Sequence, residues 1–119
     1  MTITIPFPPA TGNHMWKHAG RKHYLTEKAK RYYYEVAYHV RAQNAVLGIS
    51  DSIAVEVLVF PPDKRRRDLD NLWKVIGDSL TKAGVWEDDS LIEKIVLQRM
   101  GVDSMPRVEI RIESVAKFQ

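Results

Sequence analysis

The 119-residue sequence is 45% hydrophobic and 28% charged, with a formal net charge of +3 and no cysteine. The absence of cysteine excludes disulfides, thiolate metal sites and cysteine nucleophiles. No apolar run approaches the ~20 residues of a membrane span, and the first residues lack a signal-peptide pattern. We therefore expect a cytoplasmic protein with one domain, residues 1–119.

The N-terminal residues predict a short strand followed by a basic loop. Residues 2–5 alternate between polar and apolar side chains, and prolines at 6, 8 and 9 end the strand. Residues 10–25 are predicted to be a loop in which aromatic rings alternate with cations, among them Lys17, Arg21 and Lys22. This pattern is typical of a loop that contacts nucleic acid, with cations for phosphates and rings for bases. The alternative is an ordinary surface loop whose rings pack on the core.

Two histidines in this loop raise a second possibility. His14 and His18 are four residues apart and would share one face of a helix. Gly12 and Gly20 flank them closely, and no acidic third ligand is near. We do not expect a histidine metal site.

A first helix is predicted to begin after Thr26, which can cap the N-terminus, with Glu27 favourably placed in the first turn. Gly48 is predicted to end the helix. The tyrosines at 32–34 cannot all face the core, because successive helical side chains are about 100° apart. Residues at helical spacing mark the buried stripe: Ala29, Tyr33, Val36, Val40 and Leu47.

Residues 53–60 predict a central strand, since only Glu56 is charged and both faces are otherwise apolar or small. A second helix is predicted from about Asp70 to Lys82, with Gly84 just past its end. Strands are predicted at 92–100 and 107–114, with 101–106 as a hairpin connection. The order β-α-β-α-β-β favours an α+β domain, in which a mixed four-stranded sheet carries two helices mainly on one face.

Asp68 and Asp70 directly follow the basic run Lys64-Arg65-Arg66-Arg67. Residues two apart share a face in an extended segment, whereas on a helix they point about 200° apart. With Asp68 on the extended approach and Asp70 at the helix start, the two carboxylates can converge. At about 5 Å they repel by roughly 3 kcal/mol, which a bound cation relieves. Oxygen ligands favour Mg²⁺ or Mn²⁺.

Lys74 shares a helical stripe with Asp70, where its ammonium can stabilise charge that builds on a phosphate. Asp88 and Asp89 place a second acidic pair further along the chain. The alternative interpretation is structural, because an aspartate at a helix start is a routine cap and neighbouring arginines can satisfy both acids. The residues alone leave both interpretations open.

Two runs of residues closely resemble the RusA family of Holliday junction resolvases, which are small phage and prophage endonucleases. They are Arg65-Arg66-Arg67-Asp68-Leu69-Asp70-Asn71-Leu72, followed by Lys74, and Leu80-Thr81-Lys82-Ala83-Gly84-Val85-Trp86-Glu87-Asp88-Asp89. The opening Ile5-Pro6-Phe7-Pro8-Pro9, with Asn13 beyond it, is also similar. The length and the element order agree, so the resemblance covers essentially the whole chain.

The resemblance implies that Asp68, Asp70 and Asp89 are metal-binding and catalytic, and that Lys74 is a catalytic lysine. It also implies that Asn71 and the arginines at 65–67 support DNA contact, to which the charge pattern adds Lys64. Members of the family act as homodimers on four-way junction DNA, which they cut with Mg²⁺ or Mn²⁺. Two identical sites suit a substrate that needs two nicks in opposed strands.

We therefore expect a Mg²⁺-dependent endodeoxyribonuclease that resolves Holliday junctions by paired symmetric nicks in DNA recombination and repair. It would work in the cytoplasm of a bacterial or phage-infected cell. The alternative is a non-catalytic nucleic-acid-binding phage accessory protein, in which the basic run binds DNA and the carboxylates merely cap a helix.

Overall fold

The computed structural model describes residues 1–9, 16–19 and 22–115. Within these residues, a short 3₁₀ turn, η2 (Asp89–Leu91), precedes the strand β5. The helices and longer strands follow one another as β1 (Thr2–Pro6), β2 (Trp16–Ala19), β3 (Lys22–Leu25), α1 (Glu27–Ala42), β4 (Ile53–Phe60), α2 (Leu69–Lys82), β5 (Ile92–Arg99) and β6 (Arg107–Ser114).

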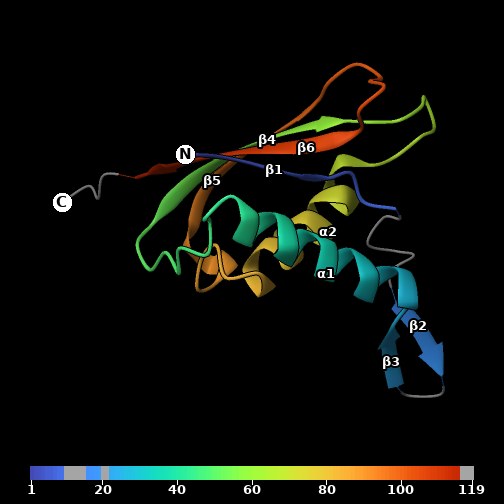
Figure 1. Cartoon of the computed structure of the whole chain (residues 1–119), viewed down its shortest axis with the longest axis horizontal. Helices are drawn as coiled ribbons and strands as arrows, with labels where there is room; N and C mark the ends of the chain where they lie inside the picture. Colours follow the sequence, from blue (N-terminus) through green and yellow to red (C-terminus); the bar gives the residue numbers. More distant parts are fainter. Residues whose placement is uncertain (10–15, 20–21, 116–119) are drawn as a thin grey trace.

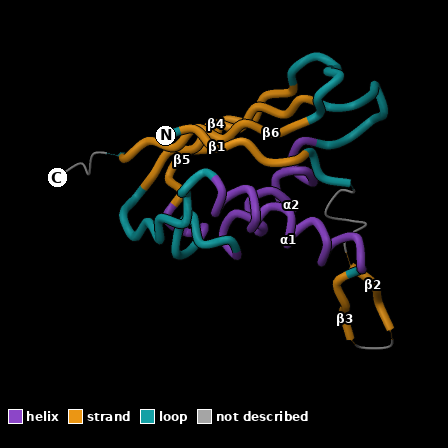
Figure 2. The backbone as a smooth tube through the Cα atoms, in the orientation of Figure 1, coloured by secondary structure: helices purple, strands orange, loops and turns teal. Residues whose placement is uncertain are grey.

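Four strands form one sheet in the order β1-β6-β4-β5. β4 and β5 run parallel, and the other neighbours are antiparallel. Figures 1 and 2 show α1 and α2 lying together against one face of this sheet. The predicted α+β fold, the mixed sheet and the helices on one face are therefore confirmed. No helix among the described residues is long and apolar enough to cross a bilayer.

The core forms where alternate residues of β4 face the helices. Ile53, Val55, Val57 and Val59 are each at most 2% exposed, and burying such a side chain contributes about 1.5–3 kcal/mol. β4 lies between β6 and β5, which confirms the central position predicted from its apolar sequence.

The α1 helix begins as predicted, because the Thr26 hydroxyl accepts a hydrogen bond from the Ala29 amide at 3.1 Å. The core position assigned to Tyr33 was wrong, since Tyr32 is 2% exposed and its hydroxyl donates to the Pro6 carbonyl at 2.7 Å. Tyr33 lies half-buried beside α2, whereas Tyr34 is 77% exposed. The expectation that the three tyrosines cannot all be buried is confirmed.

The end of α1 was predicted too late, at Gly48. The helix ends at Ala42, because Asn44 adopts a left-handed φ of 56°. The Asn44 and Ala45 amides then donate back to the carbonyls of Arg41 and Val40, which closes the helix in a Schellman motif. Leu47 therefore lies in the following loop and is 43% exposed.

Two loop predictions also need correction. Residues 16–19 and 22–25, predicted as loop, pair as an antiparallel hairpin that projects beyond the start of α1 (Figure 1). Residues 101–106 do not form a hairpin connection, because β4 lies between β5 and β6. The segment instead crosses the end of β4, held by the Asp103 amide on the Pro61 carbonyl at 3.0 Å.

The α2 helix ends as predicted, with Gly84 as the first residue past its C-cap. Gly84 has a φ of +89°, and a Cβ placed on it would lie 3.1 Å from the Val46 side chain. The Gly84 and Val85 amides donate to the carbonyls of Thr81 and Leu80 in a second Schellman motif. This turn therefore requires a residue without a side chain.

We expect Gly84→Ala to lower the free energy of unfolding by about 1–2 kcal/mol, because an L-residue is strained at positive φ. Gly101→Ala is the matched control, since a Cβ placed on Gly101 would have nothing within 4 Å. Urea unfolding followed by circular dichroism measures both. Equal stability of the two variants would contradict this assignment.

Candidate active site

The basic run and the first two acids lie beyond the carboxyl end of β4. β4 ends at Phe60, the chain passes through residues 61–68, and α2 begins at Leu69. The helix then returns alongside the sheet to reach the start of β5, which is parallel to β4. In sheets with this connection, ligands bind beyond the carboxyl ends of the strands. Asp68 and Asp70 are located beyond this carboxyl end of β4.

Asp68 occupies the N-cap position of α2 with extended backbone angles, yet its side chain makes no capping hydrogen bond. One carboxylate oxygen lies 3.5 Å from the Asn71 side-chain nitrogen. Asp70 follows in the first turn, and both acids are at least partly exposed. Within the described ranges, neither carboxylate forms an ion pair. The capping interpretation therefore lacks the contacts it requires.

Lys74 lies one helical turn after Asp70 and is exposed. The next acid on this stripe, Asp78, accepts a hydrogen bond from the Tyr33 hydroxyl at 2.7 Å and pairs with Lys82 at 3.5 Å. Burial and this hydrogen bond raise the pKa of Tyr33. In the part of the chain that the structure describes, Lys74 has no acidic partner, so its ammonium is available to an anion.

The basic run divides into structural and exposed cations. Arg67 is only 16% exposed, pairs with Asp63 at 2.9 Å and lies 5.2 Å from the centre of the Phe7 ring. The hydrogen bond from Arg67, together with the Arg65 amide, lowers the pKa of Asp63. Lys64, Arg65 and Arg66 are exposed. Arg65 also lies 3.8 Å from the Asp63 carboxylate, but its side chain is 83% exposed. Arg67 thus holds the loop in place, while the other three cations present their charge to solvent.

Asp89 lies at the opposite end of α2 from Asp68 and Asp70. It begins η2, just before β5, whose first residue pairs with Ile53 at the start of β4. The 14 residues of α2 span about 21 Å. Asp88 caps η2, accepting a hydrogen bond from the Ser90 amide at 2.8 Å, which lowers the pKa of Asp88. The three acids implied by the family resemblance do not meet within one chain.

The donor set at the start of α2 still suits a hard divalent cation. Among the described residues, no group of three acidic or histidine side chains could hold a metal. Mg²⁺, however, is commonly bound through one or two carboxylates, with water and substrate phosphate completing its coordination. Asp68 and Asp70 are two carboxylates without a cationic partner in the described chain, and they fit that arrangement.

The predicted DNA contacts of the N-terminal loop are only partly covered by the structure. Lys17 lies in β2 and Lys22 in β3, and the structure describes the backbone of both residues. Their side chains lie outside the described part of the chain, as do His14 and Arg21. Sequence reasoning missed a signal for this hairpin. Two residues, Gly20 and Arg21, separate two runs that contain aromatic residues, and a two-residue connection with glycine is typical of a β-hairpin.

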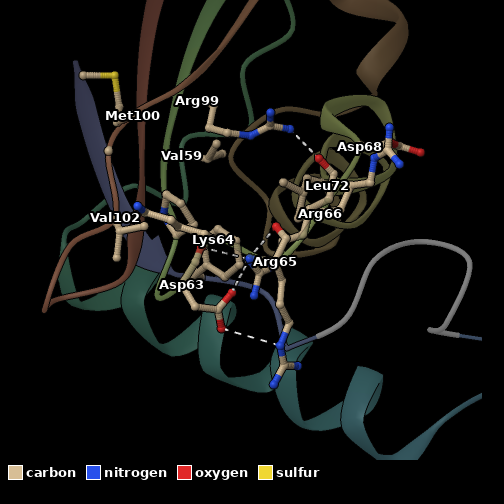
Figure 3. A pocket seen from close by; sticks show the side chains of 14 residues that line it. Val59, Asp63, Lys64, Arg65, Arg66, Asp68, Leu72, Arg99, Met100 and Val102 are labelled. Atoms are coloured by element: carbon tan, nitrogen blue, oxygen red, sulfur yellow. Dashed lines mark hydrogen bonds and ion pairs between the residues drawn. The ribbon is translucent and has the colours of Figure 1, made fainter.

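Sequence reasoning also missed a cavity of about 560 Å³ beside Asp68 (Figure 3). Arg99, from the end of β5, lines it and donates a hydrogen bond to the Arg67 carbonyl, immediately before Asp68. No local pattern marks Arg99, because its partner is 32 residues earlier in the chain. Other lining residues include Phe7, Val59, Pro61, Leu72, Met100 and Val102.

Comparison with known proteins yields one family. A family model described as Endodeoxyribonuclease RusA matches residues 6–113. The crossover junction endodeoxyribonuclease rusA of Enterobacteria phage 82 is 34% identical over 110 residues, covering 92% of this chain and 91% of the relative. The Escherichia coli K12 protein of that name is 34% identical over 111 residues, with coverage of 93% and 92%. The Shigella sonnei protein is 32% identical with the same coverage.

We expect Arg67→Ala to lower the midpoint of thermal unfolding by several degrees near neutral pH, because it removes the Asp63 ion pair and the contact with Phe7. Arg66→Ala is the matched control, since Arg66 is exposed and makes no hydrogen bond or ion pair within the described residues. Scanning calorimetry measures both midpoints. Equal unfolding midpoints for the two variants would show that the contacts of Arg67 do not stabilise the loop.

The same variant gives a pH test. The pKa of Asp63 is lower in the folded protein than its ordinary value of about 3.9. The pair therefore stabilises the fold at neutral pH, and that contribution is lost as the pH falls through the lowered pKa. The difference between wild type and Arg67→Ala should shrink toward pH ~3. A constant difference would assign the effect to packing alone.

Proposed function

The chain belongs to the RusA family of endodeoxyribonucleases, as the resemblance of residues 65–89 predicted, and from this premise we propose that it resolves four-way DNA junctions with Mg²⁺. The relatives are named as crossover junction endodeoxyribonucleases. The observation that carries the proposal is the start of α2, where Asp68 makes no capping hydrogen bond and stands beside an exposed cationic loop. Because the substrate is bacterial or phage DNA, the protein acts in the cytoplasm.

The exposed cations of the loop bind the DNA backbone. Lys64, Arg65 and Arg66 are adjacent in sequence and exposed, so each can neutralise a phosphate and release counterions. Asn71 lies in the first turn of α2, beside Asp68, where its amide can donate to a phosphate or sugar oxygen. These contacts hold the strand with the scissile phosphate over the two aspartates.

Asp68 and Asp70 would hold the metal, and Mn²⁺ could substitute because it prefers the same oxygen ligands. When bound, the cation would lower the pKa of a water molecule and would neutralise charge on the phosphate. Lys74 places a further positive charge one turn along α2, where it stabilises the negative charge of the transition state or assists the leaving oxygen. The water oxygen bonds to phosphorus and loses a proton to solvent, and the bond from phosphorus to the leaving sugar oxygen breaks as that oxygen takes up a proton.

A homodimer supplies two such centres to a nearly two-fold junction. Among the described strands, β5 has a neighbour on one side only, and Ile95 and Val96 on it are each 39% exposed, which favours this assembly. An unpaired edge strand is a ready template for another strand. Two copies of β5 paired antiparallel would bring the start of one strand beside the end of the other. Asp89 of one copy would then approach Asp68 and Asp70 of its partner.

The proposal is tested on a synthetic mobile four-way junction, with Mg²⁺, with Mn²⁺ and with EDTA, beside a linear duplex of the same arms. Paired symmetric nicks on the junction alone, lost in EDTA, are expected. Tight junction binding without nicks would favour the non-catalytic binding protein and return the acids to a structural role.

We expect Asp70→Asn to retain junction binding and to reduce nicking by more than about 100-fold, since even changes behind a metal ligand cost 10–100-fold. Glu35→Gln is the matched control, because Glu35 is exposed on α1 and lies at neither end of α2, where the acids of the proposed centre are found. Nicking rates and gel-shift affinities separate chemistry from binding. Cleavage by Asp70→Asn at the wild-type rate would refute the assigned chemistry.

The shared centre predicts complementation between inactive variants. Mixing Asp70→Asn with Asp89→Asn produces mixed dimers in which one centre has lost both acids and the other is intact. Single, unpaired nicks should therefore reappear after subunit exchange. If each centre were built from one chain, the mixture would stay inactive, because neither subunit carries a complete set of acids.

A further inference from the structure

The cavity beside Asp68 is not used by the chemistry proposed above. It lies between the segment that joins β4 to α2 and the residues that follow β5 (Figure 3). Its inner wall is apolar, since Val59, Pro61 and Leu72 are all buried. Its volume of about 560 Å³ is within the 300–1,000 Å³ that is typical of sites for small organic ligands.

The walls of the cavity are fixed by contacts between distant parts of the chain. Arg99 donates to the Arg67 carbonyl on one side, as the dashed line in Figure 3 shows. The Met100 amide donates to the Val59 carbonyl at 2.8 Å, which holds the residues that follow β5 against the end of β4. Because these contacts are made within the protein itself, little further ordering is needed for binding, and affinity benefits from such preorganisation.

The charges around the cavity have a definite arrangement. Lys64, Arg65 and Arg66 line it and are exposed, so their charges are available at its mouth. Arg67 and Arg99 also line it, but they are engaged by Asp63 and by the Arg67 carbonyl. Asp63 lines the cavity as well, and its carboxylate pairs with Arg67 at 2.9 Å and more loosely with Arg65 at 3.8 Å. The cavity therefore combines an apolar interior with a cationic mouth, and it opens beside the carboxylate of Asp68.

A nucleotide carries the complementary features, a flat ring with large apolar faces and an anionic phosphate. We propose that the cavity receives the base of one unstacked nucleotide of the cleaved strand, while Lys64, Arg65 and Arg66 hold its phosphates. This inference rests on the proposed function, because the neighbouring phosphate is the one cut at Asp68. Extruding a base is easiest where pairing is already interrupted, as it is at the crossover of a junction.

The test combines a cavity-filling variant with junctions that lack one base. Val102 lines the cavity and is 50% exposed, so Val102→Trp fills the mouth without disturbing the core. Leu47→Trp is the matched control, at a residue that is 43% exposed and lies outside the cavity. Affinities are measured with Ca²⁺ in place of Mg²⁺, for intact junctions and for junctions abasic at each nucleotide beside the cut.

Val102→Trp should weaken binding of the intact junction about tenfold, as expected for the loss of one stacked base. At one abasic position the two proteins should bind within about twofold of each other, which is the sign of a coupled pair. Leu47→Trp should match wild type on every junction.

Equal weakening by Val102→Trp on all junctions, or no weakening, would overturn the assignment of the cavity. Normal cutting with no coupling would overturn the cavity alone and leave the proposed function standing. Failure of wild type to prefer junctions over linear duplex would overturn the proposed function, and the occupant of the cavity with it.

Discussion

The parallel connection from β4 through α2 to β5 is the constraint on which the rest of the molecule depends. Parallel neighbours cannot be joined by a tight turn, so the chain must return along the sheet, here as a helix. The segment before the helix and the segment after it are therefore held at opposite ends of the strands. This single requirement brings the basic loop and Asp68 to the carboxyl end of β4 and carries Asp89 to the start of β5.

Electrostatics at the first edge depends on which arginines are already satisfied. Arg67 and Arg99 direct their hydrogen bonds to Asp63 and to a backbone carbonyl, and this fixes the loop. Asp68 and Asp70, both at the start of α2, are left without cationic partners in the described chain, so a bound cation would not have to compete with an existing ion pair. The same arrangement leaves Lys64, Arg65 and Arg66 facing solvent, where a polyanion can reach them.

Local patterns predicted much of the fold. Alternation in β4 and β6, the cap at Thr26 and the glycine after α2 are properties of a few neighbouring residues, and all were confirmed. The errors arose where distant contacts decide between local options. Tyr32 takes the core position because its hydroxyl reaches Pro6, and residues 101–106 are no hairpin because β4 separates the strands they join.

The sequence by itself determined the family, the α+β class and the residue types of the site, because these depend on motif spacing and on short periodic patterns. Only the tertiary structure decided that Arg67 supports the loop, that Arg99 lines a cavity beside Asp68 and that Asp89 lies a helix length away. Each of these depends on which surfaces pack together across long stretches of chain. Hydrogen bonds such as that from Arg99 to Arg67 join residues 32 apart, and no spacing rule within a single element specifies them.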